Sequence, residues 1–292
     1  MLRDPALLVW LDAQENTKGH PNENLARELM ELFTLGIGHY SEDDVKQAAR
    51  ALTGWKLVDD EARFVPARHD AGTKTILGRT GAFDAGGLAG LLLEQPATSR
   101  RLAWRLGHEF FGEGAVDKAA LDALAEGLRA HDLDIGWGVA KLLRSRRFFD
   151  SANLGGRVSS PIEFAVGAVR ALEMFDPSPS TPVLADWCGR LGQDLFYPPN
   201  VGGWPGGRAW ITTRSAIGRA NLAAALIGGE SVGLGAPLDP IALADRHGQR
   251  HNRSFFAQLL LGTDSLKVPL DELGSARQAL TRLLASPEAQ RI

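Results

Sequence analysis

Hydrophobic residues recur at helical spacing along most of the chain. Between residues 22 and 35 the apolar positions fall three or four residues apart, so they share one face of a predicted helix. The next periodic segment begins at Ser41, which together with Asp44 resembles a capping box, and it ends before Gly54. The fold class is therefore expected to be mainly α, a multi-helix globular domain. Further helices are predicted at 5–14, 84–95, 97–111, 117–131, 135–149, 161–175, 182–195, 213–227, 239–247, 253–262 and 274–285.

The stretch 55–78 interrupts the helical pattern. The successive segments WKLV, DDEA and RFVP predict a short β-hairpin, and KTIL, which follows, is a candidate for a third small strand. We therefore expect one small β-hairpin or three-strand element around residues 55–78.

Proline and serine cluster in DPSPSTP, residues 176–182. Such residues mark loops and boundaries between elements. We interpret the segment as a weak internal boundary inside one helical domain that spans residues 1–292.

Composition and charge exclude several classes of function. The 292 residues are 44% hydrophobic and carry a net charge of −3, which gives no electrostatic footprint for nucleic acid. No apolar run approaches the roughly 18 residues that a membrane span needs. The N-terminus lacks a signal-peptide pattern, so the chain as written is expected to be cytoplasmic. The lone Cys188 can form neither an intramolecular disulfide nor a Cys-rich metal site.

Four polar residues form a stripe on one predicted helix. Asn24, Arg27, Glu28 and Glu31 are spaced at i, i+3, i+4 and i+7, so they face the same way. Carboxylates one turn apart beside a guanidinium can bind a cation, orient a polar substrate or act as a general base. The alternative is a solvated face on which Arg27 forms ordinary ion pairs with the glutamates four residues to either side.

The segment His69–Lys74 places a His, an Asp and a Lys directly after the predicted hairpin. His69 and Asp70 offer an acid/base pair, or two ligands for a divalent metal that a helix carboxylate would complete. Turns use the same residue types to bond their own backbone, so a purely structural role stays open.

Residues 197–210 carry three aromatic residues, three prolines and four glycines. A loop of this composition is partly rigid and lets its backbone approach a ligand closely. Its rings can stack on a sugar or cap a pocket, and Arg208 can hold an anion. Alternatively, the Trp residues only pin a long loop to the core.

Four segments carry a resemblance to a known family: HPNENLARELMELFTLGIGHYSEDDVKQAARALTGW (20–55), HDAGTKTILG (69–78), GQDLFYPPNVGGWPGGRAWI (192–211) and LLASPEAQ (283–290). Together they closely resemble the bacterial domain-of-unknown-function 1800 family over nearly the whole chain. The resemblance implies a mainly helical, usually exported protein. It also implies a partner often encoded beside it, a domain-of-unknown-function 1501 protein that is similar to sulfatases and alkaline phosphatases. The resemblance supplies no reaction, but it covers the polar stripe, the His-Asp turn and the aromatic loop.

The first predicted helix corresponds to a position well inside the usual family domain. We therefore expect the N-terminal third, with any export signal, to be missing. If the missing part carries such a signal, the protein is periplasmic or extracellular. The same expectation predicts an exposed apolar patch near Leu7, Leu8, Val9 and Trp10.

One hypothesis is an envelope enzyme with a single polar cleft. Glu28 and Glu31 then act as acid/base groups or as ligands of a divalent metal, and Arg27 sets their charge. His69 and Asp70 face them from the turn. The candidate substrate-binding residues are Asn24, Trp55, Lys74, Asn200, Trp204 and Arg208.

The other hypothesis is a non-enzymatic binding or accessory protein that partners the domain-of-unknown-function 1501 protein. The polar stripe is then an interface, and the Trp loop is a stacking platform for a glycan or a peptide. The two hypotheses differ in geometry, because an enzyme requires the side chains of Glu28, Glu31 and His69 to converge on one cavity.

Overall fold

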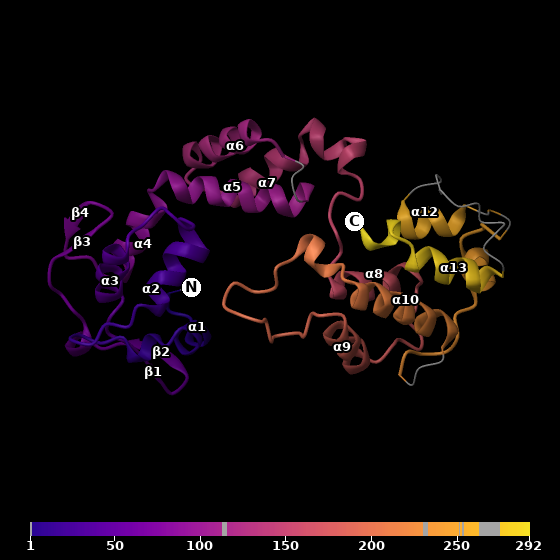
Figure 1. Cartoon of the computed structure of the whole chain (residues 1–292), viewed down its shortest axis with the longest axis horizontal. Helices are drawn as coiled ribbons and strands as arrows, with labels where there is room; N and C mark the ends of the chain where they lie inside the picture. Colours follow the sequence, from indigo (N-terminus) through magenta and orange to yellow (C-terminus); the bar gives the residue numbers. More distant parts are fainter. Residues whose placement is uncertain (1, 113–115, 230–232, 251, 253, 263–274) are drawn as a thin grey trace. The chain divides into compact units, whose positions relative to one another are not determined.

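The computed structural model describes residues 2–112, 116–229, 233–250, 252, 254–262 and 275–292, and the chain divides into two compact units (Figure 1). Unit 1 comprises Met1–Phe110 and Val116–Ser145, and unit 2 comprises Phe111–Ala115 and Arg146–Ile292. The segment 176–182 lies within unit 2. The expectation of one domain with a weak boundary at that segment stays a prediction.

Helices make up most of the described chain, which confirms the mainly α class. Up to residue 145 the α-helices are α1 (Pro5–Trp10), α2 (Asn24–Glu28), α3 (Glu42–Ala51), α4 (Ala85–Leu93), α5 (Pro96–Phe111), α6 (Lys118–Ala130) and α7 (Ile135–Leu143). Beyond it they are α8 (Pro161–Ala171), α9 (Thr181–Arg190), α10 (Thr213–Gly228), α11 (Pro240–Arg246), α12 (Phe255–Leu261) and α13 (Ala276–Ala285). Short 3-10 helices lie at Ala13–Glu15, Pro66–Arg68, Arg146–Phe149, Ser151–Asn153, Gly207–Trp210 and Glu288–Gln290.

Capping side chains fix where several helices begin. At the start of α3 the Ser41 hydroxyl accepts the Asp44 N–H at 3.2 Å, and the Asp44 carboxylate accepts the Ser41 N–H at 2.9 Å. This reciprocal pair satisfies two backbone donors that the helix itself cannot. The capping box predicted from the sequence is therefore present.

The segment predicted as one helix over 22–35 changes its geometry halfway. After α2 ends at Glu28, residues Leu29–Thr34 form a π-helix. The N–H groups of Leu35 and Gly36 both donate to the Met30 carbonyl, at 2.8 and 3.1 Å. A π-helix is rare and wider than an α-helix, and it is frequent at functional sites.

The β structure predicted around 55–78 is confirmed, but it consists of two separate sheets. β1 (Trp55–Val58) and β2 (Glu61–Phe64) form the expected antiparallel hairpin. β3 (Lys74–Ile76) pairs with β4 (Arg79–Gly81) and adds no strand to that hairpin. The reason is local: Leu77 and Gly78 both have positive φ, at 49° and 76°, as a tight two-residue hairpin turn requires, so the chain reverses directly after β3.

Each unit has its own hydrophobic core. In unit 1 the core includes Leu8, Met30 and Leu52, contributed by α1, the π-helix and the residue that caps α3. In unit 2, α8 and α10 contribute Phe164 and Leu222. Of the patch expected at the N-terminus, Leu8 is buried, whereas Val9 and Trp10 are 53% and 58% exposed. No helix in the described part of the chain is both long and apolar enough to cross a bilayer.

Residues near the end of the chain close unit 2. Arg157 and Ile292 exchange backbone hydrogen bonds of 3.1 and 2.8 Å, and the Ser159 N–H donates to the Gln290 carbonyl at 2.9 Å. The buried Arg219 side chain donates to the Ser159 carbonyl at 2.7 Å and to the Gln290 side chain at 3.2 Å. Burial lowers the pKa of Arg219 to about 10. These contacts join α10 to the start of α8 and to the final residues.

Candidate functional site

The members of the predicted polar stripe bond to different partners. Arg27 pairs with Glu42 of α3 through two hydrogen bonds of 2.7 Å, and with Glu23 at 3.3 Å. Glu31 lies beyond the start of the wider turn, and it accepts the Tyr40 hydroxyl at 2.6 Å. The expected ion pair between Arg27 and Glu23 therefore forms, whereas the described contacts of Arg27 include none to Glu31.

Electrostatics still couple the two carboxylates of the stripe. Partial burial raises the pKa of Glu28, the neighbouring Glu31 raises it further, and Arg27 opposes both effects. Burial and the hydrogen bond to Glu31 raise the pKa of Tyr40 to about 12. The Glu28 carboxylate makes no hydrogen bond to any described side chain or backbone group, so it keeps its capacity to exchange a proton. Asn24, at the start of α2, donates to Asp12 at 3.3 Å.

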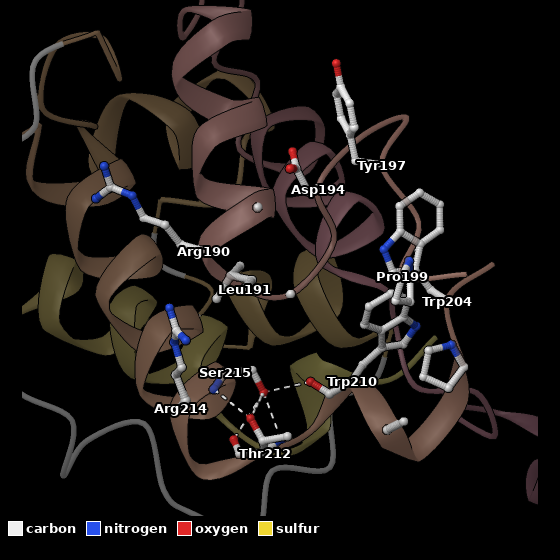
Figure 2. Close-up of a pocket in the computed structure, with 14 residues that line it drawn as sticks. Arg190, Leu191, Asp194, Tyr197, Pro199, Trp204, Trp210, Thr212, Arg214 and Ser215 are labelled. Atoms are coloured by element: carbon white, nitrogen blue, oxygen red, sulfur yellow. Dashed lines mark hydrogen bonds between the residues drawn. The ribbon is translucent and has the colours of Figure 1, made fainter. Parts of the chain in front are cut away.

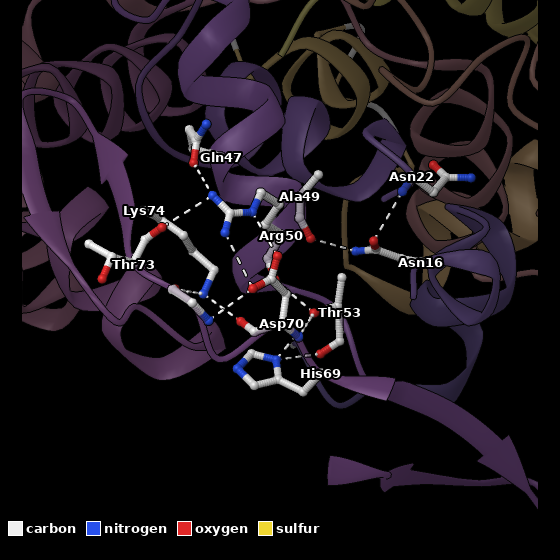
Figure 3. A network of polar contacts seen from close by, with 11 residues as sticks. Asn16, Asn22, Gln47, Ala49, Arg50, Thr53, His69, Asp70, Thr73 and Lys74 are labelled. Atoms are coloured by element: carbon white, nitrogen blue, oxygen red, sulfur yellow. Dashed lines mark hydrogen bonds and ion pairs between the residues drawn. The ribbon is translucent and has the colours of Figure 1, made fainter. Parts of the chain in front are cut away.

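The turn after the hairpin is held by a polar network of Arg50, Thr53, His69, Asp70 and Lys74 (Figure 3). Arg50, on α3, donates from Nε to Asp70 Oδ2 at 2.7 Å and from a terminal nitrogen to Oδ1 at 3.3 Å. This two-point contact with a guanidinium is a strong form of charge-assisted hydrogen bond. It lowers the pKa of Asp70 to about 2, and the Gly72 N–H contributes.

The remaining members of the polar network also bond to the protein itself. The Asp70 N–H donates to the Thr53 hydroxyl at 2.8 Å, and His69 Nδ1 lies 3.0 Å from the Thr53 carbonyl, which requires a proton on Nδ1. Lys74 is 1% exposed, and its Nζ donates to the carbonyls of Asp70 and Gly72 at 2.6 and 2.9 Å. Burial lowers the pKa of Lys74. The network therefore fixes the turn against α3. This is what a purely structural role of these residues, the alternative to an acid/base or metal site, requires.

Packing around Gly54 explains how this turn is placed. Gly54 has a φ of +98°, and a Cβ atom there would lie 2.9 Å from the Phe64 ring and 3.0 Å from His69 Cβ. The glycine thus lets β2 and the turn approach the end of α3. Trp55, a predicted substrate-binding residue, is 9% exposed and packs against Phe64 at 5.4 Å between ring centroids. It belongs to the core of unit 1.

The polar stripe and the turn are not bonded to each other among the described residues. No hydrogen bond or ion pair within that part of the chain joins Asn24, Arg27, Glu28 or Glu31 to His69 or Asp70. Within the same part, no group of three or more His, Cys, Asp or Glu side chains is placed to hold a metal ion. The expected single cleft and the catalytic roles of these residues stay predictions.

The aromatic loop forms a pocket in unit 2, which we call the loop pocket (Figure 2). Its volume is about 350 Å³. The end of α9, the loop itself and the start of α10 supply its walls. The lining residues are Gly189, Arg190, Leu191, Gly192, Asp194, Tyr197, Pro199, Trp204, Pro205, Ala209, Trp210, Thr212, Arg214 and Ser215.

Hydrogen bonds at the start of α10 fix the end of the loop. The Ser215 hydroxyl donates to the Trp210 carbonyl at 2.7 Å, and the Thr212 N–H donates to the Ser215 hydroxyl at 2.8 Å. Trp210 is 8% exposed, whereas Tyr197 is 76% exposed. Gly206 and Gly207 have positive φ, at 72° and 51°, which glycine adopts without strain where the loop turns toward Trp210.

Charged and aromatic groups face the loop pocket together. Figure 2 shows the Trp204 and Trp210 rings on one side and Arg190 and Arg214 on the other. Arg190 pairs with Asp186 at 2.6 Å, outside the lining. The Arg214 side chain makes no ion pair or hydrogen bond to a described residue, and Arg214 is exposed. The pocket can therefore offer a free guanidinium across from flat apolar rings.

The sequence identified only part of this lining. Trp204 lines the loop pocket as predicted. Asn200 turns its side chain back to the Gly202 N–H at 2.9 Å, and Arg208 is exposed beside the lining residues without joining them. Arg190 and Arg214 were missed because they lie on helices that flank the loop. Their position directly before and after a Gly/Pro-rich loop is the signal that could have identified them.

A family model described as "Protein of unknown function (DUF1800)" matches residues 1–291. No curated protein and no solved structure matches the chain.

Proposed function

The chain belongs to the DUF1800 family of proteins of unknown function, and we propose that this member is a binding protein whose loop pocket takes an acidic saccharide. The observation that carries the proposal is the uncommitted Arg214 guanidinium in one pocket with Tyr197, Trp204 and Trp210. Aromatic rings give a flat apolar surface for the C–H face of a sugar ring. A free guanidinium binds a carboxylate or sulfate in a two-point contact.

Size and charge support the same ligand class. A volume of about 350 Å³ lies at the lower end of the range for small-ligand pockets, which runs from about 300 to 1,000 Å³. Two arginines and one carboxylate, Asp194, line the pocket, and because Arg190 is paired with Asp186 outside the lining, Arg214 is the arginine left open to an anionic group. Asp194 adds an acceptor for sugar hydroxyl groups. A saccharide segment that places one acidic ring in the pocket, with its acidic group on Arg214, fits both the space and the charge.

Intrinsic tryptophan fluorescence tests the proposal, because Trp204 and Trp210 line the pocket. The probes are an α-1,4-linked trimer of galacturonic acid and the neutral trimer of galactose with the same linkage. We expect saturable binding of the acidic trimer and weaker binding of the neutral one. Trp204→Ala is expected to weaken the acidic trimer by about tenfold.

Trp10→Ala is the matched control, because Trp10 is an exposed tryptophan of unit 1. It is expected to leave the affinity unchanged. Equal affinity for the two trimers would contradict the role of Arg214, and no binding of either trimer would contradict the proposal.

A second candidate function is acid/base chemistry at Glu28, which the raised pKa of its carboxyl group beside Glu31 favours. In one version of this function the cofactor is a divalent metal held by Glu28 and Glu31. Metal analysis of the purified protein tests this metal-dependent version. About one bound equivalent that falls with Glu28→Gln supports it, and no bound metal contradicts it.

The family resemblance supports a further proposal on partners and location. We propose that the protein works in the cell envelope together with a domain-of-unknown-function 1501 protein, as the resemblance implies. Co-purification of the two products from the same bacterium tests this. A stable complex supports the accessory role, and separate elution at micromolar concentration contradicts it.

A further inference from the structure

A second pocket lies within unit 1 and shares no residue with the loop pocket. We call it the arginine pocket. Its volume is about 340 Å³. The loop after the π-helix, α5 and the start of α6 line it, and the lining includes Arg100, Arg101, Lys118, Ile37, Trp104 and Asp122.

The π-helix explains why an arginine is held in this pocket. In an α-helix the Gly36 N–H would bond to the Leu32 carbonyl four residues earlier. Here it bonds to the Met30 carbonyl, and the Leu32 carbonyl instead accepts Arg101 Nε at 3.1 Å and Arg105 at 3.3 Å. The Arg101 guanidinium is thus oriented by a backbone carbonyl, with terminal nitrogens left over.

The position of Gly36 confirms how closely the Arg101 guanidinium approaches the loop. A Cβ atom on Gly36 would lie 3.2 Å from a terminal nitrogen of Arg101. Arg101 makes no ion pair with any described residue. Burial lowers the pKa of Arg101, Arg105 adds to this effect and Glu31 opposes it. A partly buried cation without a bound carboxylate is stabilised by an anion that enters the pocket.

The charge of the lining specifies what kind of anion fits. Arg100, Arg101 and Lys118 contribute three positive charges, and Asp122, which pairs with Lys118, contributes one negative charge. With histidine counted as neutral, including His39 of the lining, the sum is +2. Adding Arg105 and Glu31, which act on Arg101 from outside the lining, leaves the sum unchanged. A phosphomonoester carries about −1.5 to −2 charges at pH 7. Its charge therefore matches that of the pocket.

Apolar side chains lie beside these cations. Ile37 is 79% exposed and Trp104 is 47% exposed, although both line the pocket. The Trp104 ring is held by His108, with 4.0 Å between ring centroids. Exposed apolar groups next to a charged site favour a ligand that has a carbon skeleton as well as an anionic group.

We propose that the arginine pocket binds a small organic phosphate, with the phosphate on Arg100 and Arg101 and the carbon skeleton against Ile37 and Trp104. The proposal is independent of the saccharide site, because the two pockets lie in different units and share no side chain.

Isothermal titration calorimetry of the full chain with phenyl phosphate and with inorganic phosphate tests the proposal. We expect phenyl phosphate to bind more tightly. Arg100→Glu reverses the charge of an exposed side chain that makes no bond to a described residue, so folding is expected to persist. This variant is expected to weaken phenyl phosphate by about tenfold or more, because a charge-assisted hydrogen bond is lost.

Two further variants separate a specific site from general charge effects. Arg129→Glu makes the same charge change on an exposed residue of α6 outside the pocket, and it is expected to leave the affinity within about twofold of the original. Ile37→Ser is expected to weaken phenyl phosphate severalfold and to leave inorganic phosphate unchanged. Trp204→Ala, in the loop pocket, is expected to change neither.

Three results would overturn the proposal. They are the absence of phenyl phosphate binding, equal losses with Arg100→Glu and Arg129→Glu, and equal affinity for phenyl phosphate and inorganic phosphate. The last result would show an anion site without an organic ligand.

Discussion

The turn at His69–Lys74 and the loop at Tyr197–Trp210 are built in opposite ways. In the turn, Asp70 bonds to Arg50, and the buried Lys74 bonds to two backbone carbonyls. Beside the loop, the Arg214 side chain makes no bond to a described residue, and the Tyr197 ring is 76% exposed. A polar group whose partners lie within the protein contributes to stability, whereas a free one can still bind a ligand. The two segments are therefore expected to fail differently when they are mutated.

The largest effect is expected from Asp70→Ala. The variant leaves Arg50 without its carboxylate partner, and both side chains are partly buried, with Arg50 27% and Asp70 18% exposed. We expect unit 1 to lose about 2–3 kcal/mol of its free energy of unfolding, measured by urea denaturation. Binding of the acidic trimer is expected to stay unchanged.

Asp60→Asn is the matched control for Asp70→Ala. Asp60 is exposed in the β1–β2 turn with a φ of 60°, a conformation that asparagine also adopts. Its effect is expected to stay within about 0.5 kcal/mol. A loss of saccharide binding in Asp70→Ala, without loss of structure in unit 2, would break the distinction between the turn and the loop.

Acid is expected to weaken unit 1 through the same carboxylate. The pKa of Asp70 is lowered from 3.8 to about 2, so its ionised form stabilises the fold at neutral pH. That contribution, on the order of 2 kcal/mol, is present above the unfolded-state pKa and is lost as the pH falls from about 4 to about 2. Urea denaturation of the original chain and of Asp70→Asn across this range measures it. A loss of equal size in both proteins would assign the acid sensitivity to other groups.

A mutation beside the loop is expected to change the affinity for the acidic trimer and not the free energy of unfolding. Arg214→Ala is expected to cost about 1–1.5 kcal/mol of binding free energy for the acidic trimer, roughly tenfold in affinity. The free energy of unfolding is expected to change by less than about 0.5 kcal/mol, because the side chain is exposed. Arg170→Ala, at an exposed residue of α8 outside the loop pocket, is the control and should alter neither quantity. A large loss of stability in Arg214→Ala would show that the loop is fixed in the same way as the turn.

The smallest effect is expected at Glu28. Its pKa is raised by burial and by Glu31, so its ionised form destabilises the fold at neutral pH. Glu28→Gln removes that charge and is expected to stabilise unit 1 by a few tenths of a kcal/mol. Glu31→Gln should have the opposite sign, because Glu31 accepts the Tyr40 hydroxyl. A decrease in the melting temperature of Glu28→Gln would contradict this sign.

Local signals in the sequence were sufficient to predict elements fixed by nearby residues. Ser41 and Asp44 form the predicted capping box, and the hairpin at 55–64 forms where the acidic turn lies. The π-helix had no such signal, because Leu29–Thr34 carries the apolar spacing of an α-helix. Its stabilising contacts come from residues distant in sequence, among them Arg101, 69 residues from Leu32. Within it, Glu31 bonds to Tyr40 and not to Arg27, which the helical spacing had offered as its partner.

The candidate site could likewise be predicted only where residues close in sequence define it. The sequence indicated the aromatic loop by its composition, and Trp204 lines the loop pocket. It gave no sign that Lys74 is buried and bonded to carbonyls, because a polar residue in a turn has the same pattern whether its partners are protein or ligand. Whether a polar side chain of the turn or the loop supports the fold or binds a ligand depends on its partners in three dimensions. Those partners are set by how the turn lies against α3 and the loop against α10.

The closure of unit 2 by Gln290 and Ile292 sets the order in which the protein can fold during synthesis. Ser159 and its partner Gln290 are 131 residues apart. At about 5–20 residues per second, roughly 7–26 s pass between the synthesis of the two. During that interval all residues of unit 1 have already been synthesised. Unit 2 still lacks the antiparallel bridge between Val158 and Arg291. Until residues 276–285 have been synthesised, α10 therefore lacks its contacts with α13, although α8 and α9, which also contact it, are already present.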